Sequence, residues 1–378
     1  MLAALVRIPF VLLPPILSDD VYRHRWDGRV LAAGIDPYLA PPASRSLEAL
    51  RDEEWRRVNH KDIRTVYGPA AQGLLGILAL SPAKASLTSI KAMAAFFDVL
   101  SVACLAWLGA PFAAFLYAVH PLAIFETAGE GHLDGVAVSV LLLAFVLFER
   151  AKGKLSAAAL ALAPLVKLTP LVAAPVLLKR LGSRGAFVFA AVIGLAHVPF
   201  LSSGGPLAGL SVYAERWEAN GFLYPGLVRG LDAVDGAAHA KTAYAGLKAL
   251  LGHPDFMDRG WGFLYTGFLA RALLGLALLV VLARIYAKNG DDAFRTAGLA
   301  LVALLAVSPT LHPWYLLHVL PFALAYRWTS VAWVAGALPL SYLHPPAQSG
   351  GTAALALWAV AYVPALALYV LVDRRRGA

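Results

Sequence analysis

Cysteine and charged residues are scarce in this sequence. Cys104 is the single cysteine and lies inside an apolar run, so neither an intrachain disulfide nor a cysteine-based metal site can form. Only 15% of the 378 residues are charged, whereas about a quarter are charged in a soluble domain. Hydrophobic residues make up 60% of the chain, and the mean hydropathy is +0.67. This composition excludes an ordinary soluble domain and predicts an integral membrane protein.

Long apolar runs recur along the chain. A helix needs about 20 apolar residues to cross a bilayer, so we predict a single all-α domain over residues 1–378 that is polytopic, with about 11 or 12 membrane segments. The first segment is interpreted as a membrane helix rather than a cleaved signal peptide, because no small-residue cleavage site follows it. The expected segments lie near 1–17, 66–82, 87–108, 110–127, 133–149, 155–178, 185–201, 263–287, 294–307, 314–326, 329–343 and 353–372.

The basic residues predict how these segments are oriented. The formal net charge is +9, but lysine and arginine cluster in short connectors between apolar runs, which is typical of cytoplasmic loops rather than of nucleic-acid binding. Two long polar connectors, 18–65 and 202–262, would then lie on the extracytoplasmic side of the plasma membrane. The motifs SDDVYR, GEGHLDG, SPTLHPW and YLHPP fall on that side as well. We therefore expect one shared extracytoplasmic site.

Two segments do not fit a simple alternation across the membrane. The segment 66–82 is short and glycine-rich, and 155–178 contains Pro164, Pro170 and Pro175. Both segments fit if they re-enter the membrane or form broken helices, which are tolerated where the backbone lines a cavity enclosed by protein. A break near the KLTP motif, which begins at Lys167, would bring that motif to the shared site.

The first polar connector begins with two carboxylates. Asp19 and Asp20 directly follow the first apolar run, where a carboxylate stays ionised yet is partly desolvated, as a general base requires. The alternative is that both residues merely cap a helix that begins at Val21. Three later residues of this loop are candidates for substrate binding, namely Tyr22, Arg23 and Arg29.

A second feature of this loop lies farther along, at residues 46–58. Leu47, Leu50, Trp55 and Val58 fall on one arc of a helix whose other positions are charged. This pattern predicts an amphipathic helix on the membrane surface, or equally a helix packed on its own membrane domain.

Four ionisable residues follow at a junction between two apolar runs. They are Glu126, Glu130, His132 and Asp134. Ionisable groups beside membrane spans are costly and usually mark a site, so we expect them to bind acceptor or sugar hydroxyls. A divalent cation on His132 and Asp134 is an alternative, although two ligands are a weak metal signal. A further alternative is a polar junction that satisfies only its own backbone.

Lys167 and a later histidine complete the candidate site. Lys167 lies in an apolar stretch and needs an anionic partner, either a lipid phosphate or a protein carboxylate such as Asp98 or Glu126. His312 could donate a hydrogen bond to the same phosphate. Trp314 and Tyr315 either stack on a sugar or, as we prefer, belong to the aromatic belt of the membrane interface. His120 and His344 each precede a proline and are interpreted as structural.

These motifs resemble those of a known family. The run SDDVYRHRWDGRVLAAGIDPY resembles the first loop of bacterial membrane mannosyltransferases related to the catalytic subunit of GPI mannosyltransferase I, which have the GT-C fold. HPLAIFETAGEGHLDG, KLTP and SPTLHPWY resemble later motifs of that group, in the same order, between about residues 18 and 315. The doubled aspartate departs from the family pattern, in which the acidic residues are often separated.

The resemblance implies an inverting transfer of a sugar, with mannose expected, from a polyprenyl-phosphate donor to a lipid-linked or glycolipid acceptor. An acidic residue of the first loop would be the base, and Asp20 falls on its position counted from the Gly-x-x-Pro-Tyr end. Asp19 is the neighbouring competitor. The leaving phosphate would be stabilised by Lys167, His312 and an arginine of the first loop. No cofactor follows from this mechanism, and a divalent cation stays open.

Two other functional classes are alternatives. A transporter of a lipid-linked or small polar substrate also uses broken helices and buried charge, but the sequence shows no pair of related halves. A non-catalytic membrane scaffold would leave Asp20, His132 and Lys167 unexplained.

Overall fold

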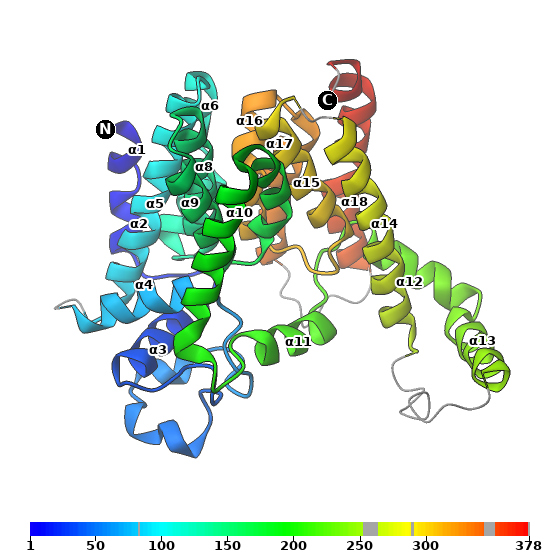
Figure 1. Cartoon of the computed structure of the whole chain (residues 1–378), viewed down its shortest axis with the longest axis horizontal. Coiled ribbons are helices and arrows are strands. Elements are labelled where there is room, and N and C mark those ends of the chain that lie inside the picture. Colours follow the sequence, from blue (N-terminus) through cyan, green and yellow to red (C-terminus); the bar gives the residue numbers. More distant parts are fainter. Residues whose placement is uncertain (82–83, 252–263, 289–290, 344–351, 377–378) are drawn as a thin grey trace.

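The computed structural model describes residues 1–81, 84–251, 264–288, 291–343 and 352–376 (Figure 1). Within these ranges the regular structure is entirely helical, and the β-type pairing consists of isolated bridges that Thr310 makes with Ala219 and Asn220. An all-α fold is therefore confirmed for the described part of the chain.

Four of the described helices are long and apolar enough to cross a membrane. They are α5 (Leu87–Trp107), the run Thr169–Phe200 that contains α10 (Ala174–His197), α14 (Thr266–Lys288), and the run Thr352–Asp373 that contains α18 (Thr352–Leu368). A fifth arises if α6 (Pro111–Ala118) and the run Pro121–Gly129 form one span bent by 60°. The other predicted membrane segments that fall on described residues correspond to shorter helices, which are not long enough to cross a membrane individually.

The shorter helices complete the architecture. Shorter apolar helices or helix pairs are Leu2–Leu12, Pro69–Leu80, Gly153–Val166, Ala293–Val307 and Thr329–Leu343. The remaining bounds are α1 Leu2–Leu5, α2 Ile8–Leu12, α3 Asp20–Ala32, η1 Arg45–Leu50, η2 Glu54–Arg57, α4 Pro69–Leu80, α7 Pro121–Ala123, η3 Ile124–Gly129, α8 Asp134–Glu149, α9 Gly153–Val166, η4 Thr169–Ala173, η5 Val198–Phe200, α11 Leu207–Arg216, α12 Tyr224–Ala233, α13 Gly236–Leu250, α15 Ala293–Val307, η8 Pro313–His318, α16 Leu320–Tyr326, α17 Thr329–Ala337, η9 Leu338–Leu343, η11 Tyr369–Asp373 and η12 Arg374–Arg376.

Helix α8 forms the centre of the bundle. Almost every residue between Asp134 and Val146 is buried, and the helix packs between α5, α9 and η8. A helix that is apolar on all sides is stable only inside a protein or membrane. Its amino end therefore holds Asp134 at a fixed place, next to the loop that carries His132.

The polar connectors gather at one end of the bundle. In Figure 1, α3 and α11 lie at this end, and both chain termini lie at the opposite end. The first segment descends from the amino terminus through α1 and α2 to α3. The carboxyl half of the motif YLHPP lies outside the described residues, as does the end of the second long connector.

Helix α4 corresponds to the short segment 66–82. It has 12 residues, so it is about 18 Å long and cannot cross a hydrocarbon core of about 30 Å. It runs across the direction of α5 in Figure 1 and packs closely on α3. The approach requires glycine, because a Cβ at Gly28 would lie 2.6 Å from the Leu75 carbonyl oxygen.

The predicted break in the segment 155–178 is confirmed. Helix α9 ends at Val166, Lys167 is extended (φ −142°, ψ 134°), and helical structure resumes at Thr169. Pro170 favours this interruption, since it has no N–H to bond the carbonyl of Val166 and its ring would clash with that carbonyl in a continuous helix. A second interruption follows at Gly182, whose φ of +66° suits glycine.

The predicted amphipathic helix at 46–58 is wrong in its form. Two short 3₁₀ helices, η1 and η2, replace it, and the chain between them is extended at Arg51. Leu47 and Val58 are buried in a core shared with Val21 of α3. The segment therefore packs on its own domain, which was the alternative interpretation, because its apolar positions reach the core without a continuous helix.

Candidate active site

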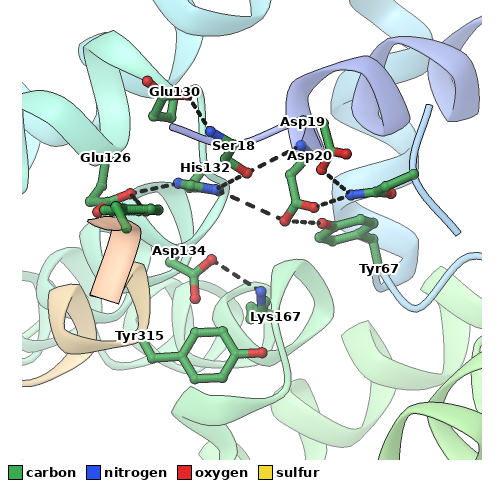
Figure 2. A network of polar contacts seen from close by, with 12 residues as sticks. Ser18, Asp19, Asp20, Tyr67, Glu126, Glu130, His132, Asp134, Lys167 and Tyr315 are labelled. Atoms are coloured by element: carbon green, nitrogen blue, oxygen red, sulfur yellow. Dashed lines mark hydrogen bonds and ion pairs between the residues drawn. The ribbon is translucent and has the colours of Figure 1, made fainter. Parts of the chain in front are cut away.

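Glu130 positions the start of α3. Its carboxylate accepts hydrogen bonds from the backbone amides of Ile16 (3.2 Å) and Ser18 (3.0 Å), and the Ser18 hydroxyl accepts one from the Asp20 amide (3.2 Å). Figure 2 shows Glu130 on the side of Ser18 that faces away from Asp20. Glu130, predicted to bind substrate, is buried and instead orders the chain that presents Asp20.

Asp20 points into a polar network rather than capping its helix. Its carboxylate accepts hydrogen bonds from Asn59 Nδ2 (2.6 Å) and from the Tyr67 hydroxyl (3.2 Å). The same Asn59 nitrogen donates to Asp19 (2.8 Å), which is exposed. Asp19 occupies the N-cap position of α3 and Asp20 its first turn, but neither carboxylate accepts a capping hydrogen bond, so capping alone does not account for the two residues. Of the two residues, Asp20 lies closer to the other candidate groups.

The surroundings of Asp20 keep it ionised. Burial alone would raise its pKa, but the charges of His132 and Lys167 and the hydrogen bond from Asn59 outweigh burial and hold the pKa below its ordinary value of 3.8. Asp20 is therefore a carboxylate at neutral pH, the form in which a base accepts a proton.

His132 joins Asp20 to a second carboxylate. Its Nδ1 lies 3.0 Å from Glu126 Oε2, and its Nε2 lies 3.1 Å from the Ser18 hydroxyl and 3.9 Å from Asp20 Oδ2 (Figure 2). Burial would lower the pKa of His132, but the hydrogen bond to Glu126 and the nearby carboxylates raise it above 6.5. Glu126 is itself held by the Tyr342 hydroxyl, whose single hydrogen is shared between the two carboxylate oxygens, each 3.0 Å away.

Trp314 is enclosed between two imidazole rings. The His132 ring stacks on it with centroids 4.1 Å apart, and the His312 ring stacks on it at 4.3 Å. Trp314 is buried, and with both histidine rings stacked on it the geometry gives no support to a sugar stacking there. Burial lowers the pKa of His312 to about 4, which makes His312 a neutral hydrogen-bonding group at pH 7.

Lys167 has a partner that the sequence analysis did not identify. Its Nζ lies 3.0 Å from Asp134 Oδ2, and the other oxygen of Asp134 lies 3.0 Å from His318 Nε2. The ammonium group also lies 5.0 Å from the Tyr315 ring and 5.5 Å from the Tyr67 ring. Cations are attracted to aromatic faces at such distances. Lys167 keeps 18% of its side chain exposed.

The two partners suggested for Lys167 are engaged elsewhere. Asp98 is buried and pairs with Arg7 and with the Tyr117 hydroxyl. Glu126 pairs with His132, as described above. The suggestion of Asp98 or Glu126 is therefore wrong, because the break after α9 turns Lys167 toward the amino end of α8.

The other candidates of the first loop have structural partners. Arg23 is buried against Asp27 (2.9 Å). Arg29 pairs with Asp52, about two turns of helix away from Asp20. Tyr22 is a core residue that the Arg57 guanidinium covers. All three lie outside the network around Asp20, so their predicted contact with substrate finds no support in the geometry.

The described residues contain no group of three or more histidine, cysteine, aspartate or glutamate side chains arranged to hold a metal ion. The divalent cation left open by the sequence thus has no ligand set in the described part of the chain.

Several network residues lack a signal in the sequence. Asn59 and Tyr67 lie about 40 residues after Asp20, and His318 and Tyr342 lie far beyond His132. Only folding brings them together. Two of them carried a hint: His318 is an ionisable residue within an apolar run, and Tyr342 begins the motif YLHPP, which the sequence analysis placed on the side of the shared site.

One of the comparisons with known proteins finds a match. Residues 1–181 match the family model described as alpha-(1->6)-mannopyranosyltransferase, N-terminal domain. The matched range contains Asp20, His132 and Lys167 but not His312. No curated protein and no solved structure matches the chain. The match to its first 181 residues supports a mannosyltransferase family and hence a glycosyltransferase with several apolar helices.

Proposed function

We propose that this protein is an inverting mannosyltransferase of the GT-C fold. It moves mannose from a polyprenyl-phosphate donor to a lipid-linked or glycolipid acceptor on the extracytoplasmic face of the plasma membrane. One observation carries the proposal: Tyr67 contacts both expected catalytic groups, Asp20 through its hydroxyl and Lys167 through its ring. A base and a cation are thus held next to one another.

Asp20 is the base in this mechanism. The acceptor hydroxyl donates its proton to the Asp20 carboxylate while its oxygen attacks the anomeric carbon. The attack comes from the face opposite the phosphate, so the bond to the phosphate breaks with inversion. Asn59 and Tyr67 fix the carboxylate, which reduces the motion needed to reach the transition state.

Lys167 and His312 serve the leaving group. A phosphate needs little protonation as it departs, but it gains charge that a fixed cation stabilises. Lys167 supplies that charge, and His312 contributes a neutral donor. The arginines of α3 do not take part in this mechanism, because Arg23, Arg25 and Arg29 are all paired with acidic residues of the first loop.

A transfer assay tests the proposal. Purified protein is incubated with radiolabelled polyprenyl-phosphate mannose and a membrane lipid extract, and the products are separated by chromatography. Label appears in a mannosylated lipid if the proposal holds. Label that stays in the donor would contradict the proposal, and unreacted donor that crosses the bilayer of proteoliposomes would identify a transporter instead.

A further inference from the structure

An aromatic group outside the catalytic network lies between the two long connectors. The Trp217 ring, just after α11, stacks on Tyr213 with centroids 5.1 Å apart and an angle of 29° between the rings. The His60 ring meets Trp217 edge to face at 4.5 Å. Trp217 and Tyr213 are half-buried, and His60 is exposed. We call these three residues the aromatic group.

The aromatic group adjoins both of the groups that carry the proposed reaction. On one side, His60 directly follows Asn59, the residue whose amide holds Asp20. On the other side, the hydroxyls of Tyr213 and Tyr315 are hydrogen-bonded, and the Tyr315 ring lies against the ammonium of Lys167. A molecule resting on Trp217 would therefore reach toward the base.

The framework around the aromatic group is built from buried contacts. Buried Arg23 donates hydrogen bonds to the carbonyl oxygens of His60 (3.4 Å) and Ile63 (3.0 Å). His60 itself has a φ of +41°, an unfavourable conformation for a residue with a side chain. Arg23 thus has a role in this loop, although not the contact with substrate expected from the sequence.

The second connector is fixed against the first by similar contacts. Thr310 donates from its hydroxyl to the Trp217 carbonyl oxygen (2.7 Å). Helix α11 approaches the first loop so closely that a Cβ at Gly209 would lie 2.4 Å from the Thr65 carbonyl oxygen. These contacts hold Trp217 next to His60 before any ligand binds.

The chemistry of the aromatic group suits a sugar. A pyranose ring presents an apolar C–H face, which packs on an indole, and a rim of hydroxyls, which need hydrogen-bonding groups. Partly exposed tryptophan and tyrosine combine an apolar face with a polar edge, and the His60 imidazole lies against Trp217. We propose that the aromatic group is the subsite for the sugar of a glycolipid acceptor. This inference rests on the proposed function and adds which residues of the protein bind the acceptor sugar.

Kinetics with two substitutions test the subsite. In Trp217→Ala the apolar platform is lost, and Trp217→Phe keeps a smaller ring. With the glycolipid acceptor varied, we expect KM to rise roughly tenfold for alanine and less for phenylalanine, whereas kcat and the KM for donor stay near the wild-type values. Trp107→Phe, on a 55% exposed tryptophan at the end of α5, is the matched control and leaves both constants unchanged. A rise in the KM for donor alone would place the donor sugar there and overturn the proposal.

A binding measurement separates this inference from the proposed function. Butyl mannoside is titrated into the protein in nanodiscs while tryptophan fluorescence is recorded, with butanol as the control for the alkyl chain. We expect saturable quenching by the mannoside that is lost in Trp217→Phe and retained in Trp107→Phe. Such quenching in a protein without transfer activity would refute the proposed function and leave the sugar subsite standing. Equal quenching in wild type and Trp217→Phe would overturn the subsite.

Discussion

The Nζ atom of Lys167 lies 3.0 Å from Oδ2 of Asp134. The two residues come from the break after α9 and from the amino end of the central helix α8. Asp134 is buried, and its other oxygen contacts His318. The cation expected to meet the donor phosphate is therefore already paired with a carboxylate of the protein.

Loss of this ion pair should destabilise the empty protein. Lys167→Met leaves a buried carboxylate without its cation, and breaking such a pair costs roughly 3–5 kcal/mol when it is fully buried. Because Lys167 is partly exposed, we expect about 2–3 kcal/mol, observed as a lower melting temperature in detergent. Lys167→Met with Asp134→Asn should recover much of the loss, and Lys152→Met on an exposed lysine should change nothing. A Lys167→Met variant that melts like the wild type would contradict the pairing.

His132 should make stability depend on pH on the alkaline side. Its folded pKa is raised above the 6.5 of the unfolded chain, so its contribution is full below pH 6.5 and is lost as pH rises through the folded pKa. The melting-temperature difference between wild type and His132→Gln should therefore shrink as pH increases above 6.5.

His312 provides the opposite case. Its folded pKa is lowered to about 4, so the unfolded chain binds more protons between pH 4 and 6.5 and wild-type stability rises with pH in that window. The melting temperature of the wild type relative to that of His312→Gln should therefore rise as the pH increases to 6.5, and it should stay constant above that pH. If the melting temperatures of His132→Gln and His312→Gln depended on pH in the same way, the pKa directions assigned to the two histidines would be wrong.

Asn59 should set the acid limb of the rate. It donates one amide nitrogen to both Asp19 and Asp20. Asn59→Asp keeps the shape but replaces this donor with a third carboxylate, and like charges favour protonation of Asp20. We expect the acid limb of kcat/KM to move up by about one pH unit or more, while Asn59→Ala lowers the rate with a smaller displacement. An unmoved acid limb in Asn59→Asp would indicate that Asp20 does not titrate in catalysis.

Part of this site could be predicted from the sequence. Asp20, His132 and Lys167 stand out because ionisable residues in apolar surroundings are costly, and the structure brings all three together. The partners could not be predicted, since Asn59, Tyr67 and His318 are brought together only by the packing of α3 on α4 and of η8 on α8. The packing of Trp314 could not be predicted for a related reason: an aromatic residue at a helix junction gives no sign that two histidines stack on it.

The fold, like the site, could be predicted only in part from the sequence. Long apolar runs and the break at Lys167 follow from hydropathy and proline. The segment 46–58 has helical periodicity but forms two 3₁₀ helices, because Asp52 binds Arg25 and Arg29 of α3 and holds the intervening chain extended. Tertiary ion pairs of this kind override local periodicity.

The orientation in the membrane remains a prediction that labelling can test. Cys104 is buried and is replaced by alanine, and single cysteines are then placed at the exposed residues Arg56, Glu215 and Lys152. An impermeant maleimide should label positions 56 and 215 in intact cells and position 152 only after permeabilisation. Labelling at 152 in intact cells would reverse the orientation.

Exchange of Asp20 for asparagine tests the central claim most directly. Asp20→Asn keeps the shape of the side chain and removes its basicity, so transfer of radiolabelled mannose should fall by roughly 10²-fold to 10⁴-fold. The thermal stabilisation that the donor gives should persist. Asp19→Asn is the matched control, since Asp19 shares the Asn59 nitrogen but is exposed, and it should stay near the wild-type rate. Near-normal turnover in Asp20→Asn, with Asp19→Asn inactive, would contradict the assignment of Asp20 as the base.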